Sequence, residues 1–173
     1  MQSRKCNSAR TVVADDQPQQ CRLHLNSDLE LLGYLLQQFE AFVWPALCQP
    51  PTRLGRARGQ ELYWQCQIAL AEGFTNAVRH AHRELPSRTP IDVDFTLWSD
   101  YLEIRICDRG APFDFQARLH AALQEGENPD REGGRGLRWM YRLMDKLDYV
   151  RSTEGYNYLV LGKYLVAEGT EAP

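Results

Sequence analysis

Three short clusters in the sequence carry groups that could do chemistry, and the first is Glu72-Gly73-Phe74-Thr75-Asn76-Ala77-Val78-Arg79-His80. In an α-helix, with about 100° between successive residues, Glu72, Asn76 and Arg79 share one narrow stripe. An Asn side-chain oxygen suits Mg²⁺, a Glu can deprotonate an attacking hydroxyl, and an Arg can neutralise phosphate oxygens. The same spacing also occurs on the solvated polar face of an ordinary amphipathic helix, so both interpretations stay open.

The second cluster is Asp108-Arg109-Gly110-Ala111-Pro112-Phe113-Asp114, which directly follows an apolar alternating segment. An Asp at a strand end can accept a hydrogen bond from the exocyclic amine of adenine. A glycine two positions later lets the backbone approach the base closely. The same D-x-G pattern is also a common turn without any ligand.

The third cluster is Gly133-Gly134-Arg135-Gly136-Leu137, a glycine-rich entry to an apolar helical pattern. Backbone N–H groups and the positive end of the helix dipole could bind a phosphate there. Glycine-rich helix entries also occur for purely structural reasons.

Hydrophobic periodicity predicts the elements that position these clusters. Alternation predicts strands at about 21–25, 91–97, 102–106, 147–153 and 156–163. Helical spacing predicts a helix that starts at a Ser27/Glu30 capping box and stops at Trp44-Pro45, a loop over 49–59, and further helices at about 60–83, 115–125 and 137–147. This order favours a two-layer α+β sandwich with a mixed, mostly antiparallel sheet and the helices on one face.

Composition restricts the class of protein. The chain has 173 residues, of which 43% are hydrophobic and 25% charged, which suits one soluble domain. We expect that domain over 21–166, with tails at 1–20 and 167–173. A formal charge of −3 argues against direct nucleic-acid binding. No long apolar run indicates a membrane span or secretory signal, so a cytoplasmic protein is expected. The five cysteines show no C-x-x-C spacing and predict buried thiols.

The order E-x-x-x-N-A-x-x-H, D-x-G-x-P-F-D and G-G-x-G-L, ahead of a helix and two final strands, resembles the GHKL ATPases. Within this histidine-kinase-like superfamily with its Bergerat fold, the chain looks like the small anti-sigma-factor serine/threonine kinases. The resemblance covers about residues 21–165. It implies an ATP site that uses Mg²⁺, closed by a lid over 114–133.

The resemblance also implies roles for single residues. Glu72 matches the general base and Asn76 the Mg²⁺ ligand, while Asp108 matches the adenine-reading aspartate and Gly110 its supporting glycine. Around the phosphates and the rest of the nucleotide, it implies contacts from Arg79, His80, Gly134, Arg135, Gly136 and Leu137. One departure is expected in the final strand, where Val160 takes the place of a Thr that helps to hold the adenine in many relatives.

The function implied is regulatory. Such a kinase would sequester a sigma factor and phosphorylate a STAS-domain anti-sigma-factor antagonist, and it would form a homodimer. The alternative is a nucleotide-gated binding module, in which ATP orders the lid and changes partner affinity without phosphoryl transfer. A third interpretation, a scaffold with a vestigial nucleotide site, also stays open.

Overall fold

The computed structural model describes residues 17–50, 54–124 and 134–167. Within them one sheet contains β1 (Gln19–Asn26), β2 (Pro90–Leu97), β3 (Tyr101–Asp108), β4 (Lys146–Arg151) and β5 (Asn157–Tyr164), in the order β1-β2-β3-β5-β4. Each described pairing is antiparallel, so the prediction of a mixed sheet was wrong in that detail. The α+β class is confirmed.

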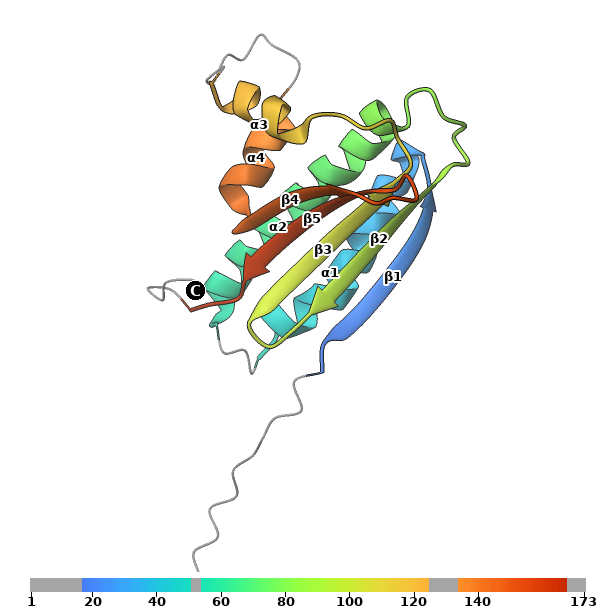
Figure 1. The fold of residues 1–173 in the computed structure, drawn as a ribbon. Helices are drawn as coiled ribbons and strands as arrows, with labels where there is room; N and C mark the ends of the chain where they lie inside the picture. Colours follow the sequence, from blue (N-terminus) through green and yellow to red (C-terminus); the bar gives the residue numbers. More distant parts are fainter. Residues whose placement is uncertain (1–16, 51–53, 125–133, 168–173) are drawn as a thin grey trace, which may run out of the picture.

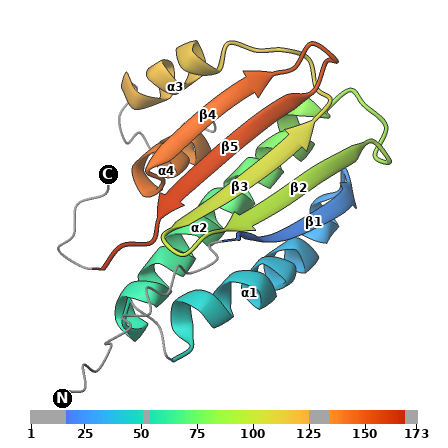
Figure 2. The same ribbon diagram turned by 60° about the horizontal axis from the view of Figure 1, so that its bottom comes forward.

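The helices form the second layer. They are the 3-10 turn η1 (Leu29–Leu31), α1 (Leu32–Cys48), α2 (Arg56–Asn76), the π-helical turn η2 (Ala77–Ala81), α3 (Phe115–Gln124) and α4 (Arg135–Leu143). Figures 1 and 2 show α1, α2 and α4 on one face of the sheet, with α3 beyond the β4 edge. The predicted two-layer sandwich is therefore the observed architecture.

The core lies between these layers. Alternate side chains of β2 and β3, including Phe95 and Ile104, are fully buried beneath the helices. The ring of Phe39 on α1 packs edge-on against Phe95, with 5.2 Å between the ring centroids. It also stacks on Tyr63 of α2, with 5.8 Å between the centroids. These contacts fix both long helices against the sheet, which gives α2 a rigid base from which to present its C-terminal residues.

Two helix boundaries differ from the prediction. Helix α1 continues through Pro45 to Cys48, because burial of Leu47 and Cys48 outweighs the loss of one backbone N–H. Ahead of α1, the 3-10 turn η1 is capped by Asp28, whose side chain accepts a hydrogen bond from the Glu30 N–H at 2.9 Å, in place of the predicted Ser27.

Helix α2 begins at Arg56, inside the predicted loop, after Gly55 at φ 75°. Strand β1 begins at Gln19, within the predicted N-terminal tail, and most of both predicted tails lies outside the described residues.

The described cysteines are all free thiols, and the prediction of buried thiols is confirmed for Cys48, Cys66 and Cys107, whereas Cys21 is half-buried. Cys66 is fully buried, and burial raises the pKa of its thiol to about 12, so it behaves as a core side chain. None of the helices in the described ranges has the length and apolar character needed to cross a bilayer.

Candidate functional site

A cavity of about 650 Å³ opens where the end of α2, the end of β3, α3 and the start of α4 meet. Its volume falls within the usual range of small-molecule sites. All three sequence clusters contribute to its lining. The predicted residues that line it are Asn76, His80, Asp108, Gly134, Gly136 and Leu137.

Four predicted residues do not line the cavity: Glu72, Arg79, Gly110 and Arg135. For Arg79 the reason is the π-helical turn η2, which accommodates more residues per turn than the α-helix assumed from the sequence. That change brings His80 to the cavity in place of Arg79, whose side chain is exposed.

Glu72 lies immediately behind the cavity wall. A Cβ atom on Gly136 would overlap the carboxylate of Glu72, so the first turn of α4 packs directly on this side chain. Since Gly136 itself lines the cavity, one glycine separates the Glu72 carboxylate from the cavity. Asn76 lies one helical turn further along α2 and reaches the lining directly.

Asp108 is held by a buried network at the end of β3. It is 5% exposed, and its Oδ1 accepts hydrogen bonds from the Gly110 N–H at 2.8 Å and from Asn157 Nδ2 at 2.7 Å. Its Oδ2 has no partner among the described residues, so that oxygen is available to a donor in the cavity. An exocyclic amine is such a donor.

Asn157 and Arg151 are candidate site residues that the sequence analysis did not single out. Asn157 is completely buried, and Arg151 Nη1 donates to its Oδ1 at 2.6 Å and to the Gly110 carbonyl at 3.0 Å. Asn157 Nδ2 also donates to that carbonyl at 3.0 Å. The strand register pairs Arg151 with Asn157 and Asn157 with Asp108, so one row of the sheet orients the carboxylate. The signal available in the sequence was a polar residue, Asn157, near the start of the strand predicted at about 156–163.

Gly110 has a packing role. A Cβ atom there would lie 2.6 Å from the Ala81 carbonyl oxygen, so only glycine lets the turn after β3 pack on the end of η2. The predicted approach of Gly110 to a base stays a prediction.

His82, directly after η2, makes a hydrogen bond to the same turn after β3. Its Nε2 accepts a hydrogen bond from the Arg109 N–H at 3.0 Å, and the side chain is buried. Burial lowers the pKa of His82, while the nearby Asp108 opposes and Arg109 adds to that shift. Neutral imidazole is the form that can accept this hydrogen bond. His80 thus lines the cavity, whereas His82 accepts a hydrogen bond from the turn after β3.

Gly134 gives α4 its orientation at the cavity. It has φ 81°, a left-handed conformation that favours glycine, and it precedes the first turn of the helix. The N-terminus of α4 therefore faces the cavity, and the N–H groups of a first helical turn, which have no partner within the helix, suit phosphate oxygens.

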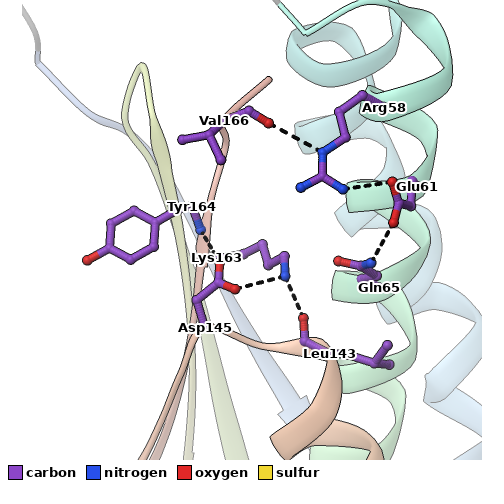
Figure 3. A network of polar contacts seen from close by, with 8 residues as sticks. All are labelled: Arg58, Glu61, Gln65, Leu143, Asp145, Lys163, Tyr164 and Val166. Carbon is purple, nitrogen blue, oxygen red and sulfur yellow. Dashed lines mark hydrogen bonds and ion pairs between the residues drawn. The ribbon is translucent and has the colours of Figure 1, made fainter. Parts of the chain in front are cut away.

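The far end of α4 is anchored by Lys163 on β5. Its Nζ donates to the Leu143 carbonyl at 2.7 Å and contacts Asp145 Oδ1 at 3.0 Å, while Asp145 Oδ2 accepts from the Tyr164 N–H (Figure 3). A cation on the last carbonyls of a helix complements its dipole. This network holds α4, and with it the glycine-rich entry, on the sheet.

The expectation for Val160 was wrong. Strand alternation turns Val160 away from the cavity, towards the face where it pairs with Arg105 and Asp148, and Leu159 lines the cavity in its place. Of the predicted lid, residues 115–124 form α3 and 125–133 lie outside the described residues. Arg118 of α3, not singled out from the sequence, adds a cation to the lining.

The donor set suits a nucleoside triphosphate with a divalent metal ion. A carboxylate oxygen is available to a base, backbone N–H groups and cations can bind phosphates, and an amide oxygen can serve as a hard metal ligand. Apolar residues such as Ile106, Met140 and Leu159 line the cavity between these groups and can contact the faces of a base.

This fold and donor set define a nucleotide-binding ATPase domain. The model of the histidine kinase-like ATPase domain family matches residues 54–163, and the chain belongs to that family. Similar proteins include the serine-protein kinase RsbW of Staphylococcus epidermidis, 38% identical over 85 residues, which are 47% of this chain and 54% of the relative. RsbW of Oceanobacillus iheyensis is 33% identical over 106 residues, 59% of this chain and 65% of the relative.

Another relative is the RsbW of a bovine Staphylococcus aureus strain, which is 36% identical over 85 residues, or 47% of this chain and 54% of the relative. The chain thus spans between about half and two thirds of the length of the relatives it matches.

Proposed function

We propose that this protein is an ATP-dependent serine/threonine protein kinase that sequesters a sigma factor and phosphorylates a STAS-domain anti-sigma-factor antagonist. One observation carries the proposal: residues far apart in the sequence line a single cavity, namely Asn76, Asp108, Gly134, Gly136 and Leu137. The similarity to proteins named serine-protein kinase supports the reaction type. The two protein partners, homodimerisation and a cytoplasmic location rest on the resemblance to the anti-sigma-factor kinases.

In the proposed binding mode, Asp108 Oδ2 accepts the amine of adenine and the α4 N-terminus binds the phosphates. His80 and Arg118 supply further polar contacts at the cavity. Asn76 would hold Mg²⁺, which when bound neutralises charge on the phosphate oxygens. Arg79, exposed and outside the lining, and Arg135 at the first turn of α4 are proposed as further phosphate contacts when a substrate is present.

In the proposed reaction, the hydroxyl oxygen of a serine or threonine forms a bond to the γ-phosphorus. The bond from that phosphorus to the bridging oxygen of ADP breaks, and the hydroxyl proton passes to the Glu72 carboxylate. Because Gly136 lies between Glu72 and the cavity, the carboxylate reaches the substrate hydroxyl at the edge of the α4 turn. ADP and the phosphorylated protein are the products.

The test is transfer of labelled phosphate from ATP to a cognate STAS-domain antagonist by the wild type and by Glu72→Gln. Gln keeps the shape but cannot take up the proton, so transfer should fall by about 10²–10⁴-fold while the dissociation constant for Mg·ATP changes little. Glu30→Gln, an exposed change in η1, is the matched control and should transfer like the wild type. Absence of wild-type transfer to an antagonist that binds would refute the kinase proposal.

The position of Glu72 outside the lining favours one alternative, a nucleotide-gated binding module without transfer. In that case ATP would change the affinity for a sigma factor, and Glu72→Gln would leave this regulation intact. A pull-down with and without ATP, repeated with the variant, separates the two functions. A scaffold with a vestigial site would give no saturable response to Mg·ATP in a calorimetric titration.

A further inference from the structure

The Tyr149 hydroxyl has no hydrogen-bond partner although it is buried. Tyr149 lies on β4 and lines the cavity, and no described residue hydrogen-bonds its hydroxyl. Burial raises the pKa of the phenol well above its usual range, and the Asp108 carboxylate adds to that rise. The hydroxyl therefore keeps its proton near neutral pH and can donate a hydrogen bond.

Two phenylalanines hold the Tyr149 ring in place. The ring of Phe115 on α3 stacks on the Tyr149 ring, with 5.3 Å between the ring centroids and an interplanar angle of 8°. The centroid of the Phe113 ring lies 4.7 Å from that of Tyr149. We call Phe113, Phe115 and Tyr149 the aromatic wall, since all three line the cavity. Packing on the ring restricts rotation of the side chain, so the hydroxyl has a defined position.

The strand register places this hydroxyl beside the Asp108 network. Tyr149 pairs with Leu159, which pairs with Ile106, and all three line the cavity. Two residues further along the strands, on the same face of the sheet, lies the row Arg151, Asn157 and Asp108. The Tyr149 row is therefore the neighbour, on that face, of the row that carries the free Asp108 Oδ2, and both Tyr149 and Asp108 line the cavity.

A buried hydroxyl without a partner is costly, and phenylalanine would fill the same space without that cost. Near Asp108, Gly110, Arg151 and Asn157 all make hydrogen bonds within the protein. Asp108 Oδ2 and the Tyr149 hydroxyl, which have no hydrogen-bond partner among the described residues, are an acceptor and a donor of residues that line one cavity.

We propose that the Tyr149 hydroxyl reads the base of the nucleotide by donating a hydrogen bond to a ring nitrogen that flanks the 6-amino group, while Asp108 accepts from that amino group. This inference rests on the proposed ATP site. Adenine presents the matching pattern, a donor amine beside acceptor ring nitrogens N1 and N7. The aromatic wall supports one face of the base beside these two contacts.

The experiment compares Tyr149→Phe with wild type in calorimetric titrations with Mg·ATP, 1-deaza-ATP and 7-deaza-ATP. Each analogue lacks one of the two ring nitrogens. The variant should bind ATP about five- to tenfold more weakly, as expected for one lost hydrogen bond. One analogue should bind wild type and variant equally, because the acceptor is already missing. Tyr141→Phe, an exposed change on α4, is the control and should bind ATP like the wild type.

Thermal unfolding of the nucleotide-free proteins provides a second readout. Tyr149→Phe should unfold at the same or a higher temperature than the wild type, because the hydroxyl has no partner to lose. A lower unfolding temperature, unchanged ATP affinity, or an equal loss for all three nucleotides would overturn the inference. A wild type that binds none of them would instead refute the ATP site, so the two failures are distinguishable.

Discussion

The side-chain amide of Asn157 on β5 donates a 2.7 Å hydrogen bond to Oδ1 of Asp108 on β3, the residue opposite it in the strand register. Asn157 is completely buried and its own oxygen accepts from Arg151. The carboxylate thus has one oxygen committed to the protein and one open to the cavity. This bond orients the acidic group at the base end of the site.

Replacing Asn157 should therefore weaken both the fold and nucleotide binding. Asn157→Leu removes one hydrogen-bond partner from the buried Asp108 Oδ1 and one from the Arg151 guanidinium. We expect the free energy of unfolding to fall by about 2–3 kcal/mol and Mg·ATP affinity to drop. Urea unfolding and calorimetry measure these effects. Asn26→Leu, the same change at an exposed position of β1, should alter neither.

The His82 imidazole predicts a pH dependence of stability. Burial holds its pKa below the ordinary 6.5, so the unfolded chain binds more protons than the folded one as the pH falls below about 6.5. The stabilisation by neutral His82 is complete above that value and is lost on acidification towards the lowered pKa. The Arg109 N–H loses its acceptor in the same range.

The measurement is the free energy of unfolding of the wild type and of His82→Gln from pH 7.5 to pH 5. We expect the difference between the two free energies to shrink as the pH falls. His120→Gln, an exposed change on α3, should keep the wild-type profile. A difference that stays constant over this range would contradict the role given to His82.

Two glycines offer a matched pair of substitutions. Gly136→Ala would push a methyl group into the Glu72 carboxylate, whereas an added Cβ at Gly33 in α1 meets no atom within 4 Å. Gly136→Ala should weaken Mg·ATP binding by about tenfold or more and displace Glu72. Gly33→Ala should stabilise the helix by about 0.5–1 kcal/mol without affecting binding. Equal behaviour of the two variants would contradict the tight packing of Gly136 on Glu72.

The anchor of α4 can be tested through Lys163. Lys163→Met removes the bonds to the Leu143 carbonyl and to Asp145, which should lower the free energy of unfolding by about 1–3 kcal/mol. Hydrogen exchange should then quicken in α4 before it does in α1. Arg88→Met, which removes an exposed cation, is the control. Unchanged exchange in α4 would show that Lys163 does not hold the helix.

Alternation and helical spacing predicted the fold class, because both patterns report directly on burial, whereas the resemblance to the GHKL ATPases implied that the three clusters form one site. The prediction from sequence was wrong where the position of a side chain depends on tertiary contacts. Of the two predicted contacts Arg79 and His80, only His80 lines the cavity, and this depends on the π-helical turn η2, which no local pattern predicted. The expectation for Val160 depended on register, and a shift of one residue moves a strand side chain to the other face.

The sequence analysis did not predict a role for Asn157 or Tyr149, for a related reason. Each acquires its role from residues on a neighbouring strand, Asp108 for one and the cavity wall for the other. Glu72 was predicted by resemblance, but its contact with Gly136 requires the packing of α4 on α2. The sequence thus indicated candidate site residues, while the contacts of these residues follow from the three-dimensional arrangement.

The most direct test of the account is a calorimetric comparison of wild type, Asn76→Ala and Asp108→Asn with Mg·ATP and with adenosine. Asp108→Asn keeps an acceptor at Oδ1 but turns the free oxygen into a donor, so both ligands should bind at least about tenfold more weakly. Asn76→Ala should weaken Mg·ATP alone, since adenosine carries no phosphates or metal. Wild-type affinity for both ligands in both variants would contradict a shared nucleotide site at Asn76 and Asp108.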